Sequence, residues 1–214
     1  MVVRLALFAS VPESDLDIVL HSFRAISGMR PRDFSETVLA WVPKYQFRPV
    51  MQAGQVNQIE QYRVFTRCSG ILIYDGQPML DHNWRLQLFE VPETGKNQKT
   101  VLQQVLSTNV QHGDLFKTIE NLGYKFSSQH WSRGFEFVVG NIVVHLLRNY
   151  SPDPNSLVDA TEQYTVMARI DVELLTDRAS IDVATKELEK LQQDLKGIVN
   201  LEMPSRGQFD TRVR

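Results

Sequence analysis

Two β-prone runs meet at Gly140-Asn141 near the middle of the chain. The first covers residues 131–139 and the second covers residues 142–150, and both are rich in branched and aromatic side chains. A Gly-Asn pair between two such runs is typical of a two-residue hairpin turn of type I′ or II′, whose twist matches that of the flanking strands. The sequence therefore predicts an antiparallel pair of strands over residues 131–150.

Both faces of this predicted hairpin are unusually apolar. Phe135, Phe137 and Val139 share one face of the first strand, and Glu136 and Val138 share the other. One interpretation is a central pair of strands buried on both sides. The other is an apolar surface that a partner protein covers. We favour the buried pair.

Composition indicates an ordinary globular protein. The chain has 214 residues, of which 43% are hydrophobic and 22% charged, and its formal net charge is −2. This charge gives no general attraction to nucleic acid or to an anionic membrane. The single cysteine, Cys68, excludes an intramolecular disulfide and fits a reducing compartment, the cytosol or the nucleus. No run approaches the roughly 20 apolar residues of a membrane-spanning helix.

Apolar periodicity predicts three helices among many strands. The expected helices cover residues 16–26, with Ser14 as N-cap, 114–122 and 180–196, and they end at Gly28, Gly123 and Gly197. The expected strands cover residues 2–10, 34–42, 46–51, 60–67, 70–74, 84–91, 124–130 and 162–175. Residues 100–111 fit a strand or a helix, and we favour a strand. The polar tail from about residue 204 is expected to be flexible unless a partner orders it.

No local motif identifies a catalytic or metal site. The five histidines are scattered, the glycines do not form a phosphate-binding loop, and Cys68 has no base that the sequence locates. Asp171 and Glu173 would share one strand face and would suit a hard cation, although a solvated strand face explains them more simply. We expect no metal and no cofactor.

The order and spacing of several segments resemble a known family. Leu122-Gly123-Tyr124 is followed by residues 131–134, the apolar hairpin ending near Tyr150, the strand over residues 164–175, and a final helix before Val199-Asn200-Leu201-Glu202. Together they are similar to the family of Mediator complex subunit eighteen, in its fungal form. The likeness covers nearly the whole chain, but its pieces are packing and turn patterns rather than catalytic signatures.

The resemblance implies a fold and a set of partners. The fold class would be α+β, mainly β: one domain over residues 1–214, an antiparallel β-barrel with a few flanking helices, similar to tunnel-type RNA triphosphatases. The protein would lie in the head module of Mediator in the nucleus. It would pair with the related barrel of subunit twenty and receive the C-terminal helix of subunit eight. It would act on RNA polymerase II directly or through the complex, without membrane contact or sequence-specific nucleic acid binding.

The likeness to tunnel enzymes makes a metal-dependent phosphohydrolase the main alternative. That chemistry requires paired carboxylates on opposing strands and inward-facing arginine or lysine. The first strand has no acidic residue, and no second pair opposes Asp171 and Glu173. Arg63, Arg67 and Arg85 would suit phosphate, but we expect surface positions for them. A small-molecule-binding β-barrel is a further alternative.

These observations favour a non-enzymatic coregulator of transcription that binds other Mediator subunits by burying apolar surface. Aromatic side chains carry a large share of the binding energy at protein interfaces. We therefore predict that Trp131, Phe135 and Phe137 lie near the groove that binds a partner helix.

Overall fold

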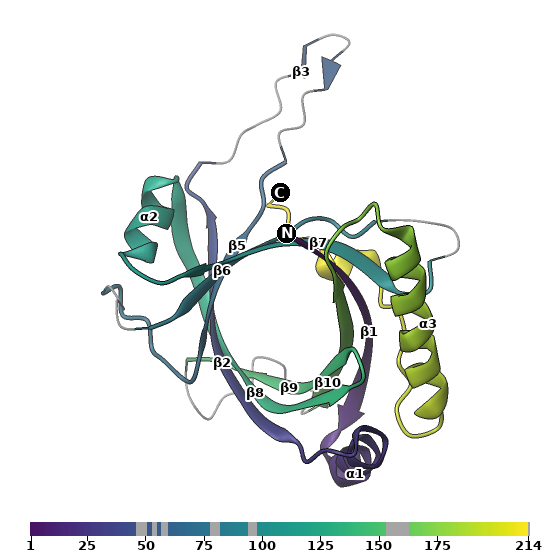
Figure 1. Cartoon of the computed structure of the whole chain (residues 1–214). Helices are drawn as coiled ribbons and strands as arrows, with labels where there is room; N and C mark the ends of the chain where they lie inside the picture. Colours follow the sequence, from purple (N-terminus) through teal and green to yellow (C-terminus); the bar gives the residue numbers. More distant parts are fainter. Residues whose placement is uncertain are drawn as a thin grey trace.

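Eight antiparallel strands close into a barrel in this computed structural model (Figure 1). The structure describes residues 1–45, 51–52, 55–56, 60–77, 82–93, 98–152 and 163–213. The strand order around the barrel is β1-β10-β9-β8-β2-β5-β6-β7. Its strands are β1 (Val2–Pro12), β2 (Arg32–Pro43), β5 (Val64–Ser69), β6 (Trp84–Phe89), β7 (Val101–Val110), β8 (Tyr124–Val139), β9 (Ile142–Tyr150) and β10 (Gln163–Val172). The short strands β3 (Met51–Gln52) and β4 (Gln55–Val56) form a separate sheet that lies apart from the barrel.

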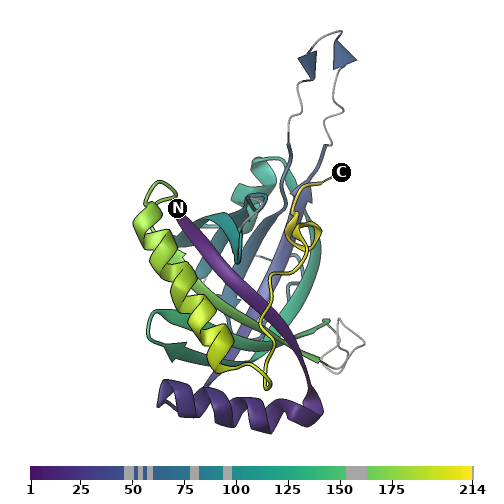
Figure 2. The same ribbon diagram turned by 90° about the vertical axis from the view of Figure 1, so that its right-hand side faces the viewer.

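Three α-helices flank the barrel. They are α1 (Leu16–Ser27), α2 (Leu115–Asn121) and α3 (Arg178–Asp194), and short 3-10 helices cover η1 (Glu13–Asp15) and η2 (Arg206–Phe209). Figure 2 shows α3 running along the outside of the wall beside β1, with α1 crossing near one end. This arrangement confirms the predicted fold class. None of the helices in the described ranges combines the length and apolar character needed to cross a bilayer.

The larger apolar core lies between the barrel wall and two helices. Val3, Leu5 and Leu7 alternate along β1 and pack with Leu188 and other residues of α3. Phe23 of α1 stacks on Phe137 of β8, with 5.5 Å between ring centroids. Because these side chains are almost completely buried, they supply most of the hydrophobic stabilisation of this half of the barrel.

A second apolar core lies under α2. Trp41 of β2 stacks on Phe116 of α2 at 5.5 Å, and Trp84 of β6 meets the same ring edge-on at 5.0 Å. Asp114 caps this helix by accepting a hydrogen bond from the amide of Lys117 at 3.0 Å. Both cores therefore lie outside the barrel wall rather than in its lumen.

The predicted hairpin is confirmed. β8 and β9 pair up to Val139 and Ile142, so Gly140 and Asn141 form the turn, and Gly140 has a φ of 59°. Phe137 faces the outer core, whereas Glu136 lines the lumen. Both faces of the hairpin therefore lie inside the protein. The outer face packs in the apolar core, and the inner face lines the lumen.

Other sequence predictions have mixed outcomes. Residues 101–110 form the favoured strand, and Gly28, Gly123 and Gly197 have positive φ values just beyond their helices. The expected strand over 46–51 lies mostly outside the described residues. Ser14 is not the N-cap of α1, because the 3-10 turn η1 precedes the helix and Asp15 takes the cap position.

Residues 70–74 do not form the predicted strand. Their backbone bonds to side chains instead: the Leu72 amide donates to Thr37 Oγ1 at 2.8 Å, and the Tyr74 amide donates to Gln129 Oε1 at 2.9 Å. The Leu72 carbonyl accepts a hydrogen bond from the Trp131 indole at 2.7 Å. These side chains satisfy backbone hydrogen-bonding groups of Leu72 and Tyr74 in place of a neighbouring strand. The β-prone composition of the segment therefore does not predict its structure.

The C-terminal segment runs along the barrel where pairing between β1 and β7 has ended. That pairing stops at Ala6 and Val101, and beyond it Phe8 exchanges two backbone hydrogen bonds with Glu202. Further along, Phe209 contacts the Phe8 ring at 4.8 Å between centroids, and the Thr211 hydroxyl donates to the Phe89 carbonyl at 2.7 Å. The tail thus contacts both β1 and β6. Its expected flexibility stays a prediction.

Gly134 sits where β8 and β9 approach too closely for any side chain. Its φ is +156°, and a Cβ atom added there would lie 1.8 Å from the Leu146 carbonyl oxygen. Glycine within a strand often marks such an approach of one backbone to another.

We predict that Gly134→Ala destabilises the fold by at least about 2 kcal/mol, because the strands must separate to admit a methyl group. Gly207→Ala is the matched control, since that position has open space and no positive φ. Urea unfolding followed by circular dichroism measures both. Equal stability of the two variants would contradict the close approach at Gly134.

A partly buried histidine, His130, lies on the inner side of β8. Both His130 and Arg67 are in register with Val38 of β2, so the two side chains share the inner face of the wall. Burial, followed by the charge of Arg67, lowers the pKa of His130 to about 4, although Glu36 acts in the opposite direction.

We predict that stability falls as the pH drops from 7 to 5. The unfolded chain binds a proton at His130 near pH 6.5, whereas the folded state resists protonation down to about pH 4. The unfolded state therefore holds more protons in this window, and the loss attributable to His130 is about 2 kcal/mol. Thermal unfolding at both pH values should show a smaller loss in His130→Gln. The exposed His21→Gln should behave as the parent, and an unchanged loss in His130→Gln would contradict the prediction.

Candidate functional site in the barrel lumen

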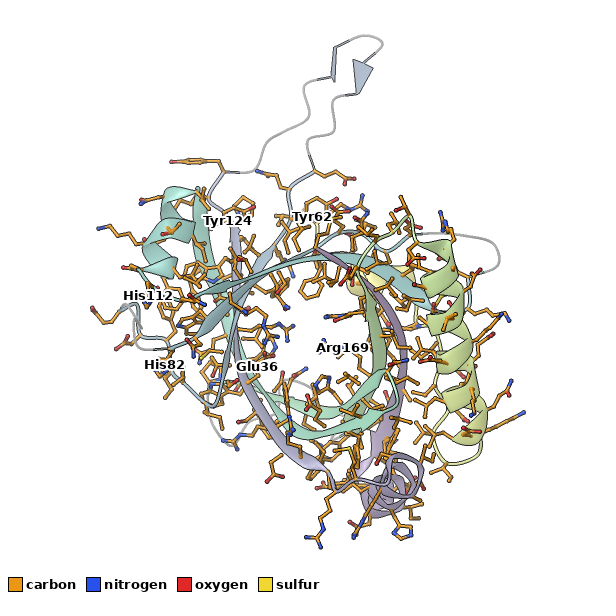
Figure 3. All side chains as sticks on the ribbon, viewed as in Figure 1. Glu36, Tyr62, His82, His112, Tyr124 and Arg169 are labelled. Atoms are coloured by element: carbon orange, nitrogen blue, oxygen red, sulfur yellow. The ribbon has the colours of Figure 1, made fainter. Side chains whose placement is uncertain are left out.

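The barrel encloses a cavity of about 690 Å³. Side chains from all eight strands line it, and Gln208, Phe209 and Thr211 of the C-terminal segment complete one part of its wall. Figure 3 shows Glu36 of β2 and Arg169 of β10 reaching the lumen from different sides. The cavity falls in the range of about 300 to 1,000 Å³ that is typical of small-molecule sites.

The lumen is rich in positive charge. Its lining includes five arginines, Arg4, Arg32, Arg67, Arg85 and Arg169, but only three carboxylates, Asp33, Glu36 and Glu136. Strand alternation explains the segregation of charge, because Arg4 and Ala6 of β1 face inward while Leu5 and Leu7 face the outer core.

Arg4 and Arg67 have close carboxylate partners. Arg4 donates two hydrogen bonds to Asp171, at 2.8 and 3.0 Å, and Arg67 contacts Glu36 at 2.7 Å. Burial acts to raise the pKa of Asp171, but the hydrogen bond and charge of Arg4 outweigh it and the pKa is lowered. Asp171 is therefore an anionic partner of Arg4.

Glu136 contacts His145 rather than lying free in the lumen. The distance from Glu136 Oε2 to His145 Nε2 is 3.0 Å, and a longer contact of 3.4 Å joins Glu136 to the exposed Arg32. Burial and then the charge of Arg169 lower the pKa of His145, despite the opposing effect of Glu136. A neutral imidazole at physiological pH is consistent with this direction.

Arg169 has no hydrogen bond or ion pair with any residue that the structure describes. Burial lowers its pKa to about 10, with Arg4 as the next cause, and Asp171 only partly offsets the effect. Arg85 likewise lacks a carboxylate partner within the described ranges, and it lies directly opposite Arg67 in the pairing of β5 with β6. Opposed like charges are unfavourable unless an anion lies between them.

Sequence reasoning placed these charges only in part. Arg63 and Arg85 are exposed as expected, but the exposed side chain of Arg85 lines the lumen, and Arg67 is partly buried there rather than at the outer surface. Asp171 pairs with Arg4 on the inner face, and Glu173 is exposed just beyond β10. The contributions of Arg4 and Arg169 were missed, although their period-two alternation with apolar residues was a usable signal.

The predicted partner-binding aromatics lie in the outer wall. Trp131 and Phe137 are 1% and 2% exposed, and Phe135 is partly buried against the larger core. Of the three, Phe135 has the surface most accessible to a partner. That these residues lie near a partner groove stays a prediction.

The remaining candidate chemistry has structural explanations. Cys68 is buried in the core under α2, and burial, followed by the charge of Glu36, raises the pKa of its thiol. A raised pKa disfavours the reactive thiolate. Within the residues that the structure describes, no three His, Cys, Asp or Glu side chains gather in a metal-binding group.

Comparison with known proteins identifies the family. The family model of Med18 protein matches residues 3–212. The Mediator of RNA polymerase II transcription subunit 18 of Yarrowia lipolytica is 35% identical over 230 residues, which cover 99% of each chain. The corresponding protein of Candida albicans is 21% identical and matches over the full length of both chains.

The fold has a counterpart among solved structures. A chain in the structure of the Schizosaccharomyces pombe Mediator head module aligns with a TM-score of 0.74 and 15% identity, covering 94% of this chain and 98% of that one. This likeness concerns the fold, whereas the family model and the Yarrowia protein concern the sequence. The barrel with its flanking helices, the matched residues 3–212 and the full-length relatives agree, and the chain belongs to the Med18 protein family, that of Mediator subunit 18.

Proposed function

We propose that this protein is a non-enzymatic structural subunit of the Mediator head module and a coregulator of RNA polymerase II transcription. The observation that carries the proposal is family membership over residues 3–212, together with a relative that is similar over its entire length. The fold likeness to a chain of a Mediator head module supports the same assignment. The site of action is the nucleus, where this transcription takes place.

The proposed partners are Mediator subunits eight and twenty. A C-terminal helix of subunit eight lays an apolar stripe in a groove of this protein, and the barrel of subunit twenty meets another surface. Exposed apolar side chains are available for such contacts, including Ile18 of α1, 61% exposed, and Val138 of β8, 40% exposed. α1 packs against β8, so Ile18 lies near the outer face of the wall that carries Phe135, whereas Val138 lies on the opposite face of β8. Contact with the polymerase is direct or through the complex.

The state of the lumen carboxylates supports a non-enzymatic role. A divalent cation needs carboxylate oxygens that are free to coordinate it. Of the lining carboxylates, Glu36 is paired with Arg67 and Glu136 with His145, and the neighbouring Asp171 is paired with Arg4. An incoming cation would have to displace these partners.

We predict that Phe135→Ala weakens association with subunits eight and twenty about tenfold, because it truncates an aromatic anchor with accessible surface. Co-purification of the full chain with both subunits measures the effect, and circular dichroism checks the fold. Phe126→Ala is the matched control, as Phe126 lies on the same strand near α2 and is 39% exposed. Unchanged association of a folded Phe135→Ala variant would show that the aromatic anchor lies elsewhere.

We also predict that the protein releases no phosphate from triphosphate-ended RNA in the presence of Mg²⁺ or Mn²⁺. Glu36, Glu136 and Asp171 are engaged by arginine or histidine, so these carboxylates are not free to coordinate a metal ion. A phosphate-release assay with an authentic RNA triphosphatase as positive control tests this. Metal-dependent release that disappears in Asp171→Ala or Glu173→Ala would contradict the non-enzymatic assignment.

A further inference from the structure

Two arginines of the lumen are not explained by the proposed scaffold role, which uses the outer surface of the barrel. Arg85 and Arg169 face the cavity without a hydrogen bond or ion pair to any described residue. The buried Arg67 Nε atom also has no hydrogen-bond partner, although another nitrogen of the same guanidinium contacts Glu36. A buried donor without an acceptor costs free energy, and an anion in the cavity would satisfy it.

The arginines face one cavity from opposite sides, since β10 lies across the closed barrel from β5 and β6. Arg67 and Arg85 are directly opposed on β5 and β6, and Arg169 of β10 is close enough to feel the charges of both Arg4 and Arg67. Guanidinium groups present several N–H donors in a planar fork that matches phosphate oxygens. Several such groups around one cavity suit a chain of phosphates better than a single monovalent anion, because each phosphate brings its own charge.

Aromatic rings line the same cavity. Phe65 and Phe89 meet edge-on at 5.6 Å, Phe8 contacts Phe209 at 4.8 Å, and the Arg67 guanidinium lies 5.9 Å from the centre of the Phe89 ring. The lumen therefore combines phosphate-binding groups with surfaces on which a flat ring can pack.

We propose that the lumen binds a short polyphosphate chain, either free or as the triphosphate of a nucleotide, and holds it through Arg67, Arg85 and Arg169. Binding needs no metal ion and breaks no bond in the ligand. The lumen faces inward and the scaffold contacts face outward, so this inference and the proposed function can fail separately.

Titration calorimetry of the full chain with sodium tripolyphosphate tests the proposal. Low salt preserves the electrostatic contacts, and EDTA removes divalent cations. We expect saturable binding of one ligand per chain. Arg85→Gln and Arg169→Gln should each weaken binding about tenfold or more, since each removes a charge-assisted contact. No detectable binding of tripolyphosphate by the folded parent would overturn the proposal.

Arg63→Gln is the matched control because it removes the same charge from an exposed position outside the lumen. It should change the affinity by less than about twofold, as expected of an exposed, screened charge. An equal loss in Arg63→Gln and Arg169→Gln would show non-specific attraction and overturn the proposal. If Arg169→Gln fails to fold, Arg85→Gln still decides the question, since the Arg85 side chain is largely exposed to the cavity solvent.

A parallel titration with ATP and GTP distinguishes the two sources of the phosphate chain. Tighter binding of a nucleotide than of tripolyphosphate would identify a nucleotide whose base packs on the aromatic rings. Equal or weaker binding would identify the free chain as the ligand, and both results support the proposal. Orthophosphate that binds as tightly as tripolyphosphate would contradict the need for a phosphate chain.

Discussion

Burial of apolar side chains on the outside of the barrel wall is the interaction on which the rest of the structure depends. α1 and α3 cover β1, β8, β9 and β10, while α2 covers β2, β5 and β6. Small closed barrels usually fill their interior with side chains. Here the helices, which lie outside the barrel in Figure 1, provide the apolar partner instead. The two cores therefore lie on separate parts of the outer wall.

This arrangement leaves the inner faces of the strands free of any requirement to be apolar. The lumen can therefore hold five arginines around a cavity of about 690 Å³ without depriving the fold of its core. It also separates two surfaces with different chemistry. The outer surface carries the apolar packing, and the inner one presents the N–H donors of arginine side chains.

Local signals in the sequence predicted much of the architecture, and long-range arrangement accounts for what they missed. Gly140-Asn141 identified the hairpin, and glycines at 28, 123 and 197 marked helix ends, because these features depend on neighbouring residues. Arg67 and Arg85 were predicted to lie at the surface. A strand with one polar face has the same alternating sequence pattern whether that face lies against bulk solvent or against a lumen. The side-chain pairing of residues 70–74 with Thr37 and Gln129 had no sequence signal at all.

The central claim is that outer apolar packing, not lumen charge, stabilises this barrel. The free energy of unfolding in urea of Leu188→Ala and Arg169→Met tests it most directly. Leu188 of α3 is completely buried against the barrel wall, so its truncation should cost about 2 to 5 kcal/mol. Arg169→Met removes a partly buried charge that has no ion pair with a described carboxylate, and it should be neutral or stabilising. A larger loss for Arg169→Met than for Leu188→Ala would contradict the account.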